Sequence, residues 1–204
     1  LSLPPNGLRA EGQPAATIVF DGSGSIWGRI DGTRAAKIDV ARDAIRALLG
    51  GRLSQTVVGL ASFGHRRKSD CSDVEVIVPP EAGAAERVGA ALDKLNPRGK
   101  GPITLAVREA AKQIGERRPA SIVLVTDNAD NCRPDFCDLG EELARTQPGL
   151  AVHIVGIALE ADEIPRTQCV AKATGGRFYD ARDATQLTQG LTEVLTLALA
   201  GDRR

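Results

Sequence analysis

Short apolar runs rich in β-branched residues alternate with helical patterns along most of the chain. Ala16–Phe20 is continuously apolar, as expected for a strand that helices cover on both faces. Apolar residues then recur from Ile38 to Leu49 at helical spacing, and Gly50-Gly51 ends this helix. The same criteria predict further strands at Thr56–Phe63, Val74–Val78, Ile122–Thr126, Val152–Leu159 and Arg177–Tyr179, and helices at Val88–Leu95, Ile103–Ile114, Leu139–Thr146, Ile164–Ala173 and Leu187–Leu199.

The connection between Phe63 and Val74 is too short to hold the crossover helix that a parallel return requires. These two strands are therefore predicted to form an antiparallel hairpin, and Pro79-Pro80 is expected to stop the second strand. Elsewhere strands alternate with helices. The predicted fold class is a doubly wound α/β domain, with a mostly parallel six-stranded sheet, one antiparallel edge strand and helices on both faces.

The size and charge of the chain narrow the possible organisation and partners. Its 204 residues suit one domain, which we assign to residues 15–200, with 1–14 as a flexible N-terminal arm and 201–204 as a C-terminal tail. Twenty-six basic residues balance twenty-six acidic ones, so no overall field favours nucleic acid or an anionic membrane. The longest apolar runs fall short of the roughly 18 residues of a membrane span. Neither a nucleic-acid partner nor a membrane span is expected in this chain.

Four cysteines, Cys71, Cys132, Cys137 and Cys169, lack the spacing of a zinc knuckle and favour two disulfides in an oxidising compartment. The alternative is four reduced thiols. The chain begins without Met or a signal segment, as a processed protein would, so a periplasmic or secreted location is expected. The pairing stays open between a local Cys132–Cys137 loop and ties to Cys71 and Cys169. All four cysteines map to loops at one edge of the sheet, where disulfides would stiffen a binding rim.

Polar side chains gather where the first strand ends. Asp21, Ser23 and Ser25 alternate along a Gly-rich turn, which would point three hard oxygens to one side, as Mg²⁺, Mn²⁺ or Ca²⁺ prefer. Asp127 ends the strand Ile122–Thr126, which is predicted beside the first strand, and could bracket the same cation. The alternative is that the carboxylates cap helices and the serines satisfy the turn.

These residues resemble the metal-ion-dependent adhesion site of von Willebrand factor A (VWA) domains, and the resemblance extends over about residues 15–200. The stretch Phe20–Gly28, Gly64-His65 and the cysteine-bearing loops are similar to bacterial exported members. The resemblance implies that Asp21, Ser23, Ser25 and Asp127 hold a divalent metal ion, most readily Mg²⁺, directly or through water. It further implies that an Asp or Glu side chain of a protein partner completes the coordination shell.

The chain departs from this family in its second loop. Alignment with the family string Gly-Lys-Thr-Pro-Leu-Thr places Gly101 where the metal-binding Thr belongs. Thr104, one turn further on, could substitute only in a shifted loop, and a water in the space left by Gly101 is the simpler prediction. Asn128 stands where Gly commonly follows the Asp, although Asn tolerates left-handed backbone angles.

Three other features have alternative interpretations. His65-Arg66-Arg67-Lys68 could recognise an acidic partner or form a solvated loop. Trp27 could belong to a docking surface or cover the first helix. His153 lies in an apolar strand and is predicted to be a hydrogen-bonded core residue.

Enzyme signatures are incomplete. The sequence has no dinucleotide fingerprint, phosphate-binding Gly-x₄-Gly-Lys loop or Gly-x-Ser-x-Gly elbow, and neither histidine is an obvious base for Ser23 or Ser25. We therefore predict a non-enzymatic adhesion or scaffold module that binds a divalent cation and an acidic protein partner. The alternatives are a scaffold whose metal site has degenerated at Gly101, and a VWA subunit of an ATPase-linked complex.

Overall fold

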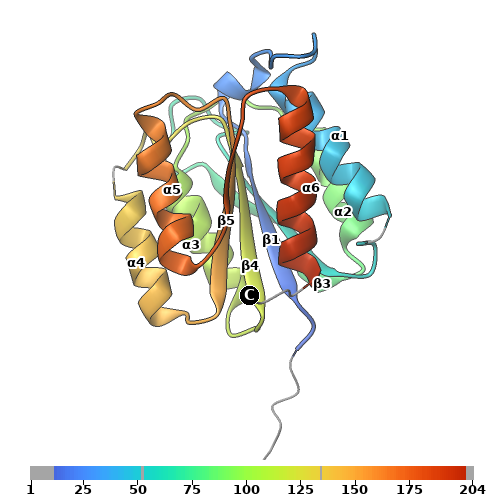
Figure 1. Cartoon of the computed structure of the whole chain (residues 1–204), viewed down its shortest axis with the longest axis vertical. Helices are drawn as coiled ribbons and strands as arrows, with labels where there is room; N and C mark the ends of the chain where they lie inside the picture. Colours follow the sequence, from blue (N-terminus) through green and yellow to red (C-terminus); the bar gives the residue numbers. More distant parts are fainter. Residues whose placement is uncertain (1–11, 52, 134, 201–204) are drawn as a thin grey trace, which may run out of the picture.

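The computed structural model describes residues 12–51, 53–133 and 135–200. In this part of the chain, a six-stranded sheet is packed between two layers of helices (Figure 1). The strands are β1 (Ala15–Asp21), β2 (Val57–Phe63), β3 (Val74–Ala82), β4 (Ala120–Thr126), β5 (Leu150–Ile157) and β6 (Phe178–Ala181). The helices are α1 (Lys37–Gly50), α2 (Ala85–Lys94), α3 (Ile103–Ile114), α4 (Phe136–Thr146), α5 (Glu163–Thr174) and α6 (Ala184–Ala200), with a 3₁₀ turn, η1 (Gly24–Trp27), after β1.

The strand order is β3-β2-β1-β4-β5-β6. All neighbouring pairs are parallel except β2 and β3, which are antiparallel at one edge. The predicted fold class is thus confirmed. The antiparallel edge follows from the short β2–β3 connection, which has no room for a crossover helix.

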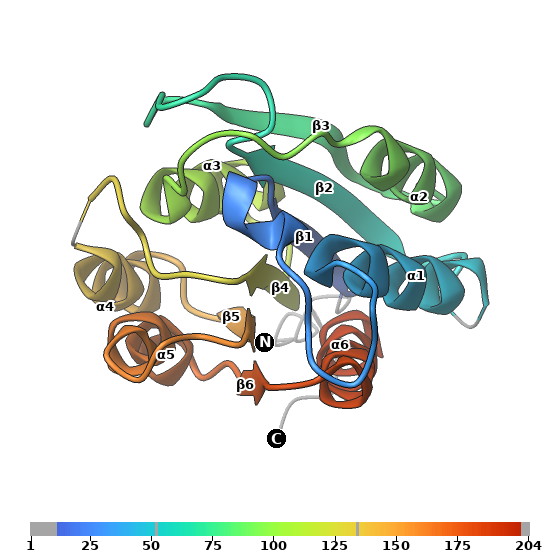
Figure 2. The same ribbon diagram turned by 90° about the horizontal axis from the view of Figure 1, so that it is seen from above.

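Helices cover both faces of the sheet, as the view from above shows (Figure 2). Helices α1, α2 and α6 pack on one face and α3, α4 and α5 on the other, each set over its own cluster of buried apolar side chains. Strands β1 and β4 are buried along their whole length because they lie at the centre of the sheet. This position explains their continuous apolar sequences. None of the described helices combines the length and apolar character that a membrane crossing needs.

Strand β3 corrects one boundary prediction. Pro79-Pro80 was expected to stop this strand, but it continues to Ala82. Proline is tolerated here because β3 is an edge strand, and its pairing with β2 is irregular between Val58 and Ala61. Most other element boundaries shift from the predictions by a few residues. In the predicted arm, residues 1–11 lie outside the described part of the chain, as does the predicted tail, 201–204.

The order of the strands reverses between β1 and β4. After β1 the chain adds β2 and β3 on one side, and then returns to place β4 on the other side of β1. In doubly wound sheets, ligands bind at the carboxyl ends of the strands where the order reverses in this way. Asp21, the last residue of β1, and Asp127, which follows β4, lie at this point.

Candidate functional site

Asp21 is the most deeply buried of the four predicted ligands. Its side chain is fully buried. One carboxylate oxygen accepts a hydrogen bond from the backbone N–H of Ser23 (2.7 Å) and the other accepts from the Thr126 hydroxyl (2.7 Å). Burial and the nearby Asp127 carboxylate raise the pKa of Asp21 to about 6, against these hydrogen bonds, which favour the charged form. The alternative role predicted for Asp21 was a helix cap, whereas its hydrogen bond with the Ser23 backbone lies within the turn that follows β1.

Hydrogen bonds connect the side chains of Ser23, Ser25 and Asp127 in sequence. The two hydroxyl oxygens lie 3.0 Å apart, and the Ser25 hydroxyl donates to Asp127 Oδ1 (2.7 Å). Ser23 and Asp127 are buried, whereas Ser25 is exposed. The structure thus brings all four predicted ligands together, and the site opens to solvent at Ser25.

The three oxygens all face the side-chain nitrogen of Asn128. Asn128 Nδ2 lies 3.3 Å from Ser23 Oγ, 3.1 Å from Ser25 Oγ and 3.0 Å from Asp127 Oδ1. Asn128 Oδ1, by contrast, is buried and has no hydrogen-bond partner among the described residues. The sequence identified Asn128 only by its backbone tolerance, so the contacts of its side chain are new information.

Lys37, at the start of α1, contacts the outer oxygen of Asp127. Its Nζ lies 3.0 Å from Asp127 Oδ2, and the Asp127 side chain is fully buried. Nothing in the local sequence marks Lys37 as part of the site, because the ion pair joins residues 90 positions apart. The ammonium offsets the cost of burying the carboxylate and leaves Oδ1 on the serine side.

Gly101 and Thr104 lie at the start of α3, near Asn128 and Asp130. A Cβ placed on Gly101 would be 2.9 Å from Asn128 Oδ1 and 3.6 Å from Phe63 Cε2, so the Asn128 amide lies close to this position. Thr104 lies in the first turn of α3, where its backbone N–H donates to Asp130 Oδ2 (2.6 Å). Its buried hydroxyl has no hydrogen-bond partner among the described residues, so no described hydrogen bond joins it to the serine oxygens.

Two disulfides connect segments near this edge. Cys71, in the β2–β3 connection, pairs with Cys132, in the β4–α4 connection, and Cys137 pairs with Cys169. The local Cys132–Cys137 loop is therefore excluded. The expectation that all four cysteines lie in loops is wrong, because Cys137 belongs to α4 and Cys169 to α5, where their bond joins two helices that pack side by side.

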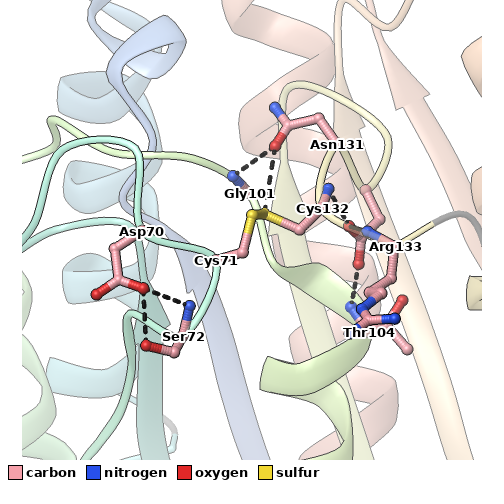
Figure 3. The surroundings of a disulfide bond; sticks show 9 residues. Asp70, Cys71, Ser72, Gly101, Thr104, Asn131, Cys132 and Arg133 are labelled. Atoms are coloured by element: carbon pink, nitrogen blue, oxygen red, sulfur yellow. Dashed lines mark hydrogen bonds between the residues drawn. A yellow bond between two sulfur atoms is a disulfide. The ribbon is translucent and has the colours of Figure 1, made fainter.

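The Cys71–Cys132 disulfide lies beside the segment that carries Gly101 (Figure 3). Asn131, next to Cys132, accepts a hydrogen bond from the Gly101 backbone N–H (3.0 Å). Further backbone contacts join the neighbouring connections, since Gly64 O accepts from Gly99 N (2.7 Å). One disulfide thus helps to brace three loops around the site.

Three residues of the basic run His65-Arg66-Arg67-Lys68 contact acidic residues of the same β2–β3 region. Arg66 Nε donates to the buried Asp73 (2.7 Å), Arg67 pairs with Asp70 (3.0 Å), and His65 contacts Glu75 (3.0 Å). Much of the basic run therefore stabilises its own loop instead of forming a free positive surface.

Trp27 and His153 have distinct environments. The Trp27 side chain is 47% exposed beside the site, and its indole N–H donates to Pro97 O (3.0 Å). His153 is a buried hydrogen-bonded residue, as predicted, with Nδ1 accepting from the backbone N–H of Arg177 (3.0 Å). It lies in β5, near a cavity of about 600 Å³ that also borders Arg118, away from Asp21.

The chemistry of the site fits a hard divalent cation. Two hydroxyl oxygens and a carboxylate oxygen surround one point, and Asn128 supplies a buried amide oxygen without a partner. Among the described residues, no cluster of three or more His, Cys, Asp or Glu side chains is placed to hold a metal ion. A cation here would therefore depend on hydroxyl and amide oxygens as well as the two carboxylates.

Comparison with known proteins agrees with this architecture. The family profile described as von Willebrand factor type A domain matches residues 17–129, more than half of the chain. No curated protein sequence matches the chain at a significant level.

Similar solved structures include a von Willebrand factor type A protein from Catenulispora acidiphila, with a TM-score of 0.71, 16% identity and coverage of 90% of this chain and 42% of that one. Proximal thread matrix protein 1 from the mussel byssus has a TM-score of 0.67 at 18% identity, with 92% and 48% coverage. The pilus adhesin SpaC from Lactobacillus rhamnosus GG has a TM-score of 0.69 at 14% identity, with 93% and 31% coverage. This chain spans less than half of each of these proteins. By fold and family profile, the chain belongs to the von Willebrand factor type A domain family.

Proposed function

We propose that this chain is a protein-docking module that holds a divalent cation, most readily Mg²⁺, with Mn²⁺ or Ca²⁺ as substitutes. The ligand set comprises Asp21, Ser23, Ser25 and Asp127, directly or through water. The observation that carries this proposal is the convergence of Ser23 Oγ, Ser25 Oγ and Asp127 Oδ1 on one point at the reversal of strand order.

The charges of the site favour an acidic partner when a cation is bound. Asp21, Asp127 and Lys37 together carry one net negative charge when all three are ionised. A divalent cation reverses this to one net positive charge, and Ser25 leaves the site open to solvent. A partner's Asp or Glu carboxylate would then bind the cation and neutralise the site.

A binding role is also consistent with the similar structures, which include a pilus adhesin and a byssus matrix protein. We propose no catalytic step, because His65 contacts Glu75 and His153 lies away from Ser23 and Ser25. The two disulfides support a periplasmic or secreted location, since such bonds persist in oxidising compartments.

One observation favours a second candidate, a metal-independent scaffold. Lys37 and the Asn128 amide nitrogen contact the oxygens of the site without any cation. In this case partners would bind through other surfaces, and chelation of divalent metals would leave binding unchanged.

Isothermal titration calorimetry of the oxidised, metal-free protein with Mg²⁺, Mn²⁺ and Ca²⁺ tests the first candidate. We expect one cation per chain, and an affinity lowered about tenfold or more in Ser25→Ala. The matched control is Ser72→Ala, because Ser72 is an exposed loop serine whose hydroxyl contacts Asp70. Absence of cation binding to the native protein would refute the proposal.

The acidic partner is tested with immobilised poly-glutamate, with poly-lysine as the control surface. Binding to poly-glutamate should require Mg²⁺ and disappear with EDTA. Equal binding with and without EDTA would favour the metal-independent scaffold.

A further inference from the structure

The Asn128 side chain fills the space that a side chain at position 101 would occupy. A Cβ at position 101 would lie 2.9 Å from Asn128 Oδ1, which is closer than side-chain atoms normally approach. Glycine at this position is thus what allows the Asn128 side chain to extend toward the serines. Two hydrogen bonds join the segments that carry these residues. The Gly101 backbone N–H donates to Asn131 Oδ1, 30 positions away, and the Thr104 backbone N–H donates to Asp130 Oδ2, 26 positions away.

The amide group of Asn128 lies where a cation ligand would have to be. Its nitrogen contacts Ser23 Oγ, Ser25 Oγ and Asp127 Oδ1 at 3.0–3.3 Å. Its oxygen is buried and has no hydrogen-bond partner among the described residues. A buried acceptor without a partner is unfavourable, so this arrangement leaves an amide oxygen available for another contact.

We propose that Asn128 Oδ1 is a further ligand of the cation, an inference that rests on the proposed function. A half-turn about the terminal side-chain torsion of Asn128 exchanges its nitrogen and oxygen, and this torsion is soft in asparagine. The oxygen then faces the point on which the serine hydroxyls and Asp127 converge. Side-chain amide oxygens are ordinary ligands of hard divalent cations.

The reversed amide would need an acceptor for its nitrogen on the Gly101 side, and Asn131 Oδ1 is a polar atom on that side. When the oxygen faces the cation, the amide nitrogen turns toward Gly101, where Asn131 Oδ1 lies 3.8 Å from the position of a Cβ. Asn131 is held there by the Gly101 backbone N–H (3.0 Å). An amide ligand is also neutral, so the site keeps the positive charge that attracts an acidic group.

Calorimetry with Mn²⁺ on the oxidised full chain tests this role in three variants. Asn128→Ala removes the amide oxygen and should lower the affinity for Mn²⁺ about tenfold or more. Asn128→Asp keeps a side-chain oxygen of similar reach and should bind Mn²⁺ at least as tightly as the native protein. Asn128→Ala combined with Gly101→Thr supplies a hydroxyl from position 101 in place of the amide oxygen. This variant should recover much of the affinity for Mn²⁺ that Asn128→Ala loses.

Each outcome separates this inference from the proposed function. If native protein and Asn128→Ala bind Mn²⁺ equally, Asn128 is not a ligand, while the proposed cation site remains. If neither the native protein nor any variant binds, the proposed function fails and the inference fails with it. If only the Gly101→Thr/Asn128→Ala variant binds, the native site lacks a ligand that the threonine hydroxyl supplies, and both proposals are wrong.

Folding of each variant is checked by urea unfolding without metal. The same measurement on Asn128→Asp is a further test. A third carboxylate, beside those of Asp21 and Asp127, should lower the free energy of unfolding without metal, and added Mn²⁺ should restore it. An Asn128→Asp variant whose stability does not rise with added Mn²⁺ would contradict a ligand at this position.

Discussion

Removal of the Cys71–Cys132 disulfide should weaken both the fold and the cation site. The bond joins the β2–β3 connection to the β4–α4 connection, and the adjacent Asn131 holds the Gly101 backbone. Replacing both cysteines with serine keeps the local polarity and size but releases the two loops. The second disulfide, Cys137–Cys169, provides a matched control because it joins α4 and α5 instead.

The loss of stability follows from the length of chain that each bond closes. The sequence separation is 61 residues for Cys71–Cys132 and 32 for Cys137–Cys169. In the chain-entropy description, loops of these lengths correspond to about 4 kcal/mol each, slightly more for the longer loop. Urea unfolding of the two double-serine variants should therefore show similar decreases in the free energy of unfolding.

Cation binding should distinguish the two variants. Under conditions where both are folded, the Cys71→Ser/Cys132→Ser variant should bind Mn²⁺ about tenfold more weakly, because the loop positioning Gly101 and Asn128 gains freedom. The Cys137→Ser/Cys169→Ser variant should retain native affinity. Equal affinities in both variants, measured by calorimetry, would refute the reasoning that the first disulfide braces the site.

Three further predictions concern single residues. Desolvation, and to a smaller extent Arg177, lowers the pKa of His153 to about 4 from 6.5. Because the unfolded chain binds this proton first, stability should fall by about 3 kcal/mol as pH drops from 6.5 to 4; a His153→Gln variant whose urea midpoint falls as steeply would contradict this. Lys37→Gln should tighten Mg²⁺ binding several-fold by removing a repelling charge, yet destabilise the metal-free protein because buried Asp127 loses its partner; unchanged calorimetric affinity and urea stability would refute this. Fluorescence of Trp27, the only tryptophan, should be quenched by Mn²⁺ and restored by excess Mg²⁺, whereas no quenching at saturating Mn²⁺ would place the cation elsewhere.

The sheet was predictable because its signals are local. Central strands such as β1 are buried on both faces and therefore read as continuous apolar runs. The antiparallel β2–β3 pair followed from the length of one connection. The extension of β3 past Pro79-Pro80 was missed although an edge strand was predicted, because the two prolines lie at a register shift in the pairing with β2 that the sequence does not reveal.

The candidate site was predictable only in part. Asp21, Ser23 and Ser25 form a compact motif, and the order of strands brings Asp127 beside them. Lys37 gave no signal, because its ion pair exists only once α1 lies against the end of β4. The cysteine pairing could not be predicted either, because four cysteines permit three connectivities and only the fold determines which one forms.

The two departures from the family pattern are best understood as one structural feature. In the sequence, Gly101 suggests a missing ligand and Asn128 a tolerated turn residue, and each is interpreted alone. In the structure, the space that a side chain at 101 would fill contains the amide of Asn128, with 2.9 Å between the would-be Cβ and Oδ1. A threonine at 101 alone would therefore meet this amide instead of an open pocket. On the proposal that Asn128 Oδ1 binds the cation, Asn128 supplies an oxygen that glycine at position 101 cannot, and the two departures compensate each other instead of marking decay of the site.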